Sequence, residues 1–238
     1  QGFNCLMDTL FKPFSTSSYL EEIKLIQPQG PYFLAGHSFG GFVAFEIAQQ
    51  LSRQGETVAV LALFDCFGPN GYDKSTFFQR LSIHLNNLSE LSFKEKVTYF
   101  TQRFEYILQS KIPWSWQQKY LKLTNLISSP EQKLISQIEN LNFQAHQRYT
   151  PTVYEGKLTL FRARVRQTYG YFDPYGGWQG MASGGIDGDE VPGSHTSLLL
   201  KPENSQILAE KLKPILANFT DQPQLDESAK MTQIKLRQ

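Results

Sequence analysis

The feature that most constrains this chain is a short polar motif between a strand pattern and a helix pattern. Residues 30–55 read GPYFLAGHSFGGFVAFEIAQQLSRQG, in which an apolar run ends at GHSFG (36–40) and a helical pattern follows at once. The pentad fits G-x-S-x-G, the signature of a tight strand-to-helix turn that exposes a reactive serine. At positions 36 and 40 we expect glycine because side chains there would collide with neighbouring elements.

Ser38 is therefore the candidate nucleophile, with Gly36, Gly40 and Gly41 shaping the turn. A strained backbone conformation at Ser38 would hold its Oγ clear of the turn. The backbone N–H of Phe39 would then face the reacting carbonyl, and the helix N-terminus would favour the oxyanion. The alternative is a glycine-rich turn that contains an incidental serine.

The segments on both sides of the motif predict a βαβ unit. Pro31–Gly36 is a short apolar strand, Gly41–Arg53 has helical periodicity, and Thr57–Phe64 is a nearly unbroken apolar run. Such a run suits a parallel strand that is buried on both faces. The crossover between the two strands should be right-handed.

The same alternation returns near the end of the chain. We expect a helix over Thr16–Gln27, a strand over Lys157–Ala163, a second strand ending at Glu190–Val191, and a final helix from Pro202 to about Asn218. Residues 166–185 are rich in glycine and aromatic residues, which indicates a loop. The fold class predicted is α/β with a mostly parallel sheet.

The middle of the chain, residues 73–147, has helical periodicity and few strand signals, so we expect a helical insertion. One apolar stripe comprises Phe77, Leu81, His84, Leu85 and Leu88, and a second comprises Phe93, Val97, Phe100, Phe104 and Leu108. We expect these stripes to form the insertion's own core. The polar residues 220–238 are expected to be a disordered tail after a domain spanning 1–219.

Composition excludes several classes of partner. The formal net charge is +1, which gives no reason to expect nucleic acid as a partner. No apolar run approaches the roughly 18 residues that a membrane span needs, so no membrane partner is expected. Cys5 and Cys66 form no metal-binding spacing, so no metal is expected, and we predict a cytoplasmic protein.

A serine nucleophile needs a base, and the chain has four histidines. His37 adjoins Ser38, so its ring should point away from Oγ and pack or hydrogen-bond under the turn. His84 and His146 lie in the helical insertion and are expected to be surface or packing residues. His195, in VPGSHTSLL, follows a strand pattern and precedes the last helix. Only His195 leaves room for the chain order nucleophile, acid, histidine.

The acid that orients the histidine should follow a strand. Asp65 ends the run TVAVLALF and is the favoured candidate, because an apolar strand that closes on one aspartate is hard to explain by burial. Asp173 in YFDPYGGW is the competitor. Asp187 and Asp189 lie close to His195 in the sequence and are expected on a surface turn.

These residues carry a family resemblance. The stretches IQPQGPYFLAGHSFGGFVAFEIAQQL, VLALFD, YEGKLTLFRA and VPGSHTSLL resemble the C-terminal (type I) thioesterase domain of nonribosomal peptide synthetases and polyketide synthases, an α/β-hydrolase. The resemblance places the acid at Asp65, 27 residues after Ser38, and implies that residues 73–147 form a lid. It also implies roughly two strands and a loop upstream of Gln1, the loop supplying a second oxyanion N–H.

The resemblance further implies the chemistry. The substrate would be an acyl, peptidyl or polyketide chain on the 4′-phosphopantetheine arm of a carrier protein, with no directly bound cofactor. Ser38 would form an acyl-enzyme, which water or an internal nucleophile would release. Three alternatives stay open: a free-standing editing thioesterase, an ordinary ester hydrolase, and a non-catalytic fragment that binds a carrier protein.

Overall fold

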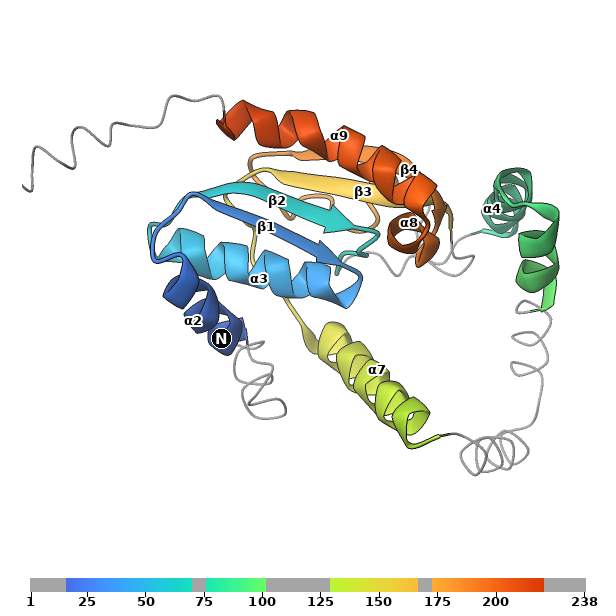
Figure 1. Ribbon diagram of the computed structural model, residues 1–238, viewed down its shortest axis with the longest axis horizontal. Helices are drawn as coiled ribbons and strands as arrows, with labels where there is room; N and C mark the ends of the chain where they lie inside the picture. Colours follow the sequence, from blue (N-terminus) through green and yellow to red (C-terminus); the bar gives the residue numbers. More distant parts are fainter. Residues whose placement is uncertain (1–15, 70–75, 102–128, 167–172, 221–238) are drawn as a thin grey trace, which may run out of the picture.

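The computed structural model describes residues 16–69, 76–101, 129–166 and 173–220 (Figure 1). Several predictions fall outside these ranges, namely those for Cys5, Phe104, Leu108, the tail from 221 onward and part of the predicted loop. The described residues form an α/β structure with a parallel sheet, as the sequence predicted.

The sheet has four strands in the order β1-β2-β3-β4, and every neighbouring pair is parallel. The strands are β1 (Tyr32–His37), β2 (Val58–Phe64), β3 (Leu158–Val165) and β4 (Ile186–Ser194). The prediction of a surface turn for Asp187 and Asp189 was wrong, because both lie on β4 opposite Thr159 and Phe161 of β3. Their side chains are nevertheless exposed, since β4 forms an edge of the described sheet.

Helices cover both faces of this sheet (Figure 1). On one face lie α3 (Phe39–Arg53) and, beside it, α2 (Thr16–Ile26). On the other face lies α9 (Pro202–Thr220), which follows the short helix α8 (Ser197–Leu200). The final helix predicted from Pro202 to about Asn218 is α9, and Pro202 opens it because proline fits the first turn of a helix.

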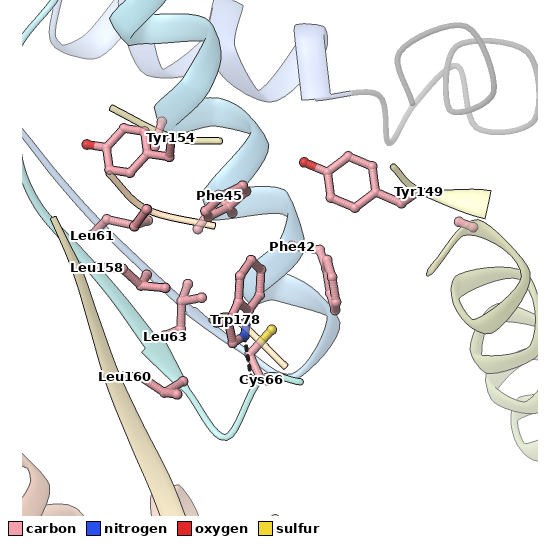
Figure 2. Packing of buried hydrophobic residues seen from close by; sticks show 14 residues of the cluster. Phe42, Phe45, Leu61, Leu63, Cys66, Tyr149, Tyr154, Leu158, Leu160 and Trp178 are labelled. Carbon is pink, nitrogen blue, oxygen red and sulfur yellow. Dashed lines mark hydrogen bonds between the residues drawn. The ribbon is translucent and has the colours of Figure 1, made fainter. Parts of the chain in front are cut away.

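Alternate residues of the strands supply two separate cores. Leu61, Leu63, Leu158 and Leu160 face α3, whereas Phe161 and Ala163 face α9. Figure 2 shows the first core, in which the buried Trp178 ring lies 4.7 Å from Phe45 and 5.3 Å from Phe42 between ring centroids. The backbone turn that carries the serine is thereby fixed on a well-packed helix.

The central segment is helical where it is described. It comprises α4 (Phe77–Glu90), residues 93–101, and α7 (Pro130–Arg148). The predicted stripes do not form a core, however, because their side chains are largely exposed: Phe77, Leu81, Leu85, Phe93, Val97 and Phe100. In α4 the buried side chains are instead Ile83 and Asn87.

Polar contacts near both ends of this segment attach it to the α/β body. Asn87 Nδ2 donates to the Arg166 carbonyl at 2.6 Å, and the Arg166 N–H donates to Asn87 Oδ1 at 2.9 Å. At the other end of the segment, the Tyr149 hydroxyl donates to Glu46 Oε2 of α3 at 2.8 Å. The insertion is therefore held at α4 and at the residue that follows α7, and its role as a lid stays a prediction.

Candidate active site

The strand-to-helix turn places Ser38 in a strained conformation. Ser38 has φ 54° and ψ −126°, a region that non-glycine residues rarely adopt. Its N–H donates to the Phe64 carbonyl at 3.1 Å, so the turn begins as an extension of the β1–β2 ladder. The helix α3 starts at Phe39, two residues earlier than the sequence predicted, which makes the turn tighter than expected.

Two of the three glycines of the motif are required by close packing. A Cβ at Gly36 would lie 2.2 Å from the Gly40 carbonyl oxygen, and a Cβ at Gly41 would lie 2.5 Å from Cys66 Sγ. The expected collision at Gly40 was wrong, because a Cβ there would meet no atom of a neighbouring element within 4 Å. The crowding comes from the backbone of residue 40, which leaves no room for a side chain on residue 36.

Phe39 is the first residue of α3, so its amide is among those that have no acceptor within the helix. The first-turn amides carry the positive end of the helix dipole. Both features favour an anion beside Ser38. The role of the Phe39 N–H as an oxyanion donor remains a prediction.

The second and third candidate residues meet directly. His195 Nδ1 lies 2.7 Å from Asp65 Oδ2, although 130 residues separate them in the sequence. The other carboxylate oxygen of Asp65 accepts the Ala163 N–H at 3.0 Å, and the Asp65 N–H donates to the Phe161 carbonyl at 2.7 Å. Asp65 is buried, and its backbone has φ 43°, so both its position and its orientation are fixed.

This contact selects one tautomer of His195. An ionised carboxylate only accepts hydrogen bonds, so Nδ1 carries the proton and donates it to Asp65. The second ring nitrogen, Nε2, is then left with a lone pair that can accept a proton. The His195 side chain keeps about a quarter of its surface exposed, at 27%, so the ring can meet a substrate.

The competing carboxylates are engaged elsewhere. Asp173 accepts the Tyr175 N–H at 3.0 Å and the Gly177 N–H at 2.6 Å, which closes its own turn. Asp187 pairs with Lys157 at 2.6 Å, and Asp189 pairs with Lys211 of α9. Among the described aspartates, Asp65 is the one that contacts His195.

The remaining histidines have other contacts. His37 Nε2 lies 2.9 Å from the carbonyl oxygen of His195, and burial lowers the pKa of His37. His84 Nδ1 contacts the Tyr99 hydroxyl at 2.5 Å within the helical segment, in keeping with the packing role expected for it. His146 lies on α7, and its side chain is outside the described set.

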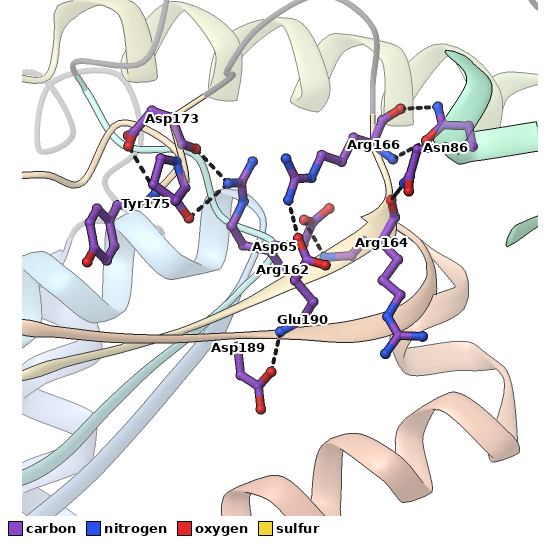
Figure 3. Close-up of polar contacts among 12 residues, drawn as sticks. Asp65, Asn86, Arg162, Arg164, Arg166, Asp173, Tyr175, Asp189 and Glu190 are labelled. Atoms are coloured by element: carbon purple, nitrogen blue, oxygen red, sulfur yellow. Dashed lines mark hydrogen bonds and ion pairs between the residues drawn. The ribbon is translucent and has the colours of Figure 1, made fainter. Parts of the chain in front are cut away.

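Sequence reasoning missed two buried hydrogen-bond donors near Asp65. Arg162, on β3, is buried, and its Nη1 donates to the carbonyls of Asp173 at 2.6 Å and Pro174 at 2.9 Å (Figure 3). Trp178 Nε1 donates to the Cys66 carbonyl at 2.8 Å, directly after Asp65. The stretch FRARVR, with arginine at every second position of a strand, was the available signal for Arg162.

The Cys66 thiol, a second potential nucleophile near Ser38, is not available for reaction. Cys66 is buried, and burial raises the pKa of its thiol well above the usual range, so it stays protonated. Across the described ranges, no three His, Cys, Asp or Glu side chains are grouped as a metal site. Within those same ranges, no helix combines the length and the apolar character needed to cross a membrane.

Curated relatives are large multidomain proteins. The chain is 29% identical over 201 residues to malpinin synthetase of Mortierella alpina, covering 82% of this chain and 2% of that protein. It is 47% identical over 72 residues to the bikaverin polyketide synthase bik1 of Gibberella fujikuroi, covering 30% of this chain and 3% of that protein. The chain therefore spans only a few per cent of the length of these relatives.

Solved structures share the fold. The NocB thioesterase domain, solved as a covalent complex with a fluorophosphonate nocardicin G analogue, matches with a TM-score of 0.54 and 22% identity. That match covers 84% of this chain and 72% of the other. A four-domain nonribosomal peptide synthetase, holo-AB3403, matches with a TM-score of 0.55 and 24% identity over 84% of this chain and 15% of the other.

A family model decides the assignment. The model described as thioesterase domain matches residues 16–216, which include Ser38, Asp65 and His195. The curated relatives are a synthetase and a polyketide synthase, and the solved thioesterase domain has the same fold as this chain. This chain belongs to the thioesterase domain family and has the α/β-hydrolase fold of such domains.

Proposed function

We propose that this domain is a serine thioesterase in which Ser38, His195 and Asp65 form the catalytic triad. The observation that carries the proposal is the His195–Asp65 hydrogen bond of 2.7 Å at the same end of the sheet as the strained Ser38 turn. Family membership supports the coarser statement that the domain is a hydrolase with a serine nucleophile.

The proposed reaction begins at the free nitrogen of His195. Nε2 takes the proton of Ser38 Oγ while Oγ attacks the thioester carbonyl, and the developing oxyanion accepts the Phe39 N–H. Asp65 stabilises the imidazolium that forms. The tetrahedral intermediate then collapses, the carbon–sulfur bond breaks, and His195 returns the proton to the leaving thiol. The acyl group stays on Ser38 as an ester.

A second nucleophile completes the cycle. Water, or a hydroxyl or amine of the acyl chain itself, attacks the ester while His195 takes its proton and passes it to Ser38 Oγ. The product is a free acid in the first case and a ring in the second. The relatives are synthetases and polyketide synthases, so we propose that the substrate is an acyl, peptidyl or polyketide chain. A carrier protein would hold it through phosphopantetheine, and the cytoplasmic location expected from the sequence stays a prediction.

Intact-mass measurement tests this proposal. The domain is mixed with a fluorophosphonate, and separately with an acyl thioester of N-acetylcysteamine, with the Ser38→Ala variant as control. We expect one adduct on the wild type and none on the variant. No adduct on the wild type would favour the non-catalytic carrier-binding protein. Faster turnover of simple oxygen esters than of thioesters would favour an ordinary ester hydrolase.

A further inference from the structure

His37 links two segments that come from opposite edges of the described sheet. It ends β1, directly before Ser38, whereas His195 follows β4. Strands β2 and β3 lie between these edges. The His37 side chain nevertheless reaches the His195 loop, and its Nε2 lies 2.9 Å from the His195 carbonyl oxygen. The turn that carries the nucleophile is thus bonded to the loop that carries the base.

The direction of this hydrogen bond is fixed by chemistry. A carbonyl oxygen only accepts, so His37 donates its Nε2–H, and its Nδ1 is unprotonated in the neutral ring. The two imidazole rings also pack on each other, with centroids 4.6 Å apart and planes tilted by 32°. Burial lowers the pKa of His37, so the ring beside His195 is a neutral donor near neutral pH. A neutral ring does not oppose protonation of His195 during catalysis.

The other hydrogen bonds that hold the His195 loop do not involve residues of the Ser38 turn. Gly193 has φ 96°, and the Ser194 N–H donates to Ser197 Oγ at 2.7 Å. The buried Asn204 of α9 donates to the Ser197 carbonyl at 3.0 Å. These contacts fix the loop on α8 and α9, and Asp65 fixes the Nδ1 side of the ring. The hydrogen bond from His37 fixes the position of the His195 loop relative to the Ser38 turn.

We propose that His37 is a positioning residue that sets the distance between the His195 ring and Ser38 Oγ. This proposal rests on the proposed function, because it assigns His37 a role in that triad. His37 is covalently joined to Ser38, so its bond to the His195 carbonyl ties the backbones of nucleophile and base together. A misplacement of about 1 Å between reacting groups can cost about 10²-fold in rate.

Three substitutions separate the bond from the ring packing. His37→Phe keeps a ring but loses the donor. In His37→Gln, the amide nitrogen reaches the place of Nε2 and can still donate to the His195 carbonyl. In His37→Asn, the amide nitrogen reaches only the place of Nδ1. We expect kcat for an N-acetylcysteamine thioester to fall by about 10 to 10²-fold in the Phe and Asn variants, with KM nearly unchanged. The Gln variant should recover most of the loss.

A second measurement does not depend on turnover. The His195 Nδ1 proton shared with Asp65 can be observed by NMR of protein with ¹⁵N-labelled histidine. We expect this proton to exchange faster with water in the Phe and Asn variants, and at the wild-type rate in the Gln variant. If the wild type forms no Ser38 adduct, the proposed function fails, and this exchange pattern still decides whether His37 positions His195.

Two outcomes would overturn the inference. Wild-type kcat and wild-type proton exchange in the Phe and Asn variants would show that the bond positions nothing. An equal loss of kcat in all three variants, accompanied by an equal fall in Tm, would show that His37 only supports the fold. If the Phe variant does not fold, the comparison of Asn with Gln decides the question alone.

Discussion

The carboxylate of Asp65 holds two groups at once: the His195 ring on one oxygen, at 2.7 Å, and the Ala163 amide on the other, at 3.0 Å. Strand β2 pairs with β3 only as far as Phe64 and Phe161. The side chain of Asp65 therefore continues the ladder for one more residue after the β2 backbone has turned away. Asp65, the residue that follows the end of β2, thus also orients the His195 ring.

Asp65→Asn tests this dual role. The Asn oxygen can still accept the Ala163 N–H, but its NH₂ then faces His195 Nδ1 and forces the proton onto Nε2. We expect kcat to fall on the order of 10⁴-fold, as when other triads lose the correct tautomer, with little change in stability. The matched control is Asp173→Asn, which alters a turn away from His195 and should leave kcat within a few-fold. Reversed effects in a steady-state assay would place the acid at Asp173.

Ser38→Gly should stabilise the domain while abolishing activity. At φ 54° and ψ −126°, glycine avoids a strain of about 1–3 kcal/mol, whereas Ser38→Ala retains that strain. Urea unfolding should therefore rank the glycine variant above both the wild type and the alanine variant. Ser82→Gly, on the exposed face of α4, is the control and should cost about 0.5–1 kcal/mol. A glycine variant no more stable than the alanine variant would contradict the strained turn.

Asn87→Leu should release α4 from the sheet. The change leaves the N–H and the carbonyl of half-buried Arg166 without their partner, at a cost of up to about 1–3 kcal/mol for each group. Hydrogen exchange in residues 77–90 should accelerate, while exchange in 57–64 stays slow. Asn86→Leu is the control, because exposed Asn86 makes a single bond of 3.2 Å to the Arg164 carbonyl. Similar exchange in the two variants would reject Asn87 as the anchor.

The contact between Glu95 and Lys201 predicts a pH-dependent stability. Hydrogen bonds from Lys201 and Ser92 lower the pKa of Glu95 from 4.5 to about 2. Because the folded-state pKa lies below the unfolded one, the contribution is complete above pH 4.5 and is lost as the pH falls toward about 2. The difference in unfolding free energy between wild type and Glu95→Gln should therefore be largest above pH 4.5 and shrink as the pH falls toward about 2.

Solvent exposure limits the size of this effect. Glu95 and Lys201 keep 33% and 44% of their side-chain surfaces exposed, so salt should weaken the pair. Urea midpoints of the two proteins, measured at low and at high ionic strength, check both expectations. A difference that stays constant with pH would show that the pair does not stabilise the fold.

The central strands and helices were predictable because their patterns are local. The apolar run TVAVLALF and the helical periodicity after Ser38 can each be recognised within a few residues. Together they predict a parallel sheet. Strand β4 was harder, since IDGDEVPGS contains aspartate and glycine, which strands disfavour. Its pairing with β3 overrides that preference. Asp187 and Asp189 are tolerated because both side chains stay exposed on this edge strand and pair with Lys157 and Lys211.

Apart from the pairing of Asp65 with His195, the contacts between distant residues were not predictable. Asn87 is a polar residue within a helical pattern, yet it is fully buried against Arg166, which lies 79 residues away. The apolar stripe that includes Phe77 and Leu81 has helical spacing, but periodicity cannot say what covers a stripe. The bond between His37 and His195 spans 158 residues, so only the assembled sheet brings its two ends together.

The separation between Asp65 and His195 has a consequence during synthesis. Residues 30–64 contain β1, α3 and β2, which together form the Ser38 turn from local contacts. The proposed base, His195, lies 130 residues after the proposed acid, Asp65, beyond the helical segment and β4. A serine hydroxyl without a base is a weak nucleophile. On the proposed mechanism, a nascent chain therefore carries a serine without its base until the residues that follow β4 have left the ribosome.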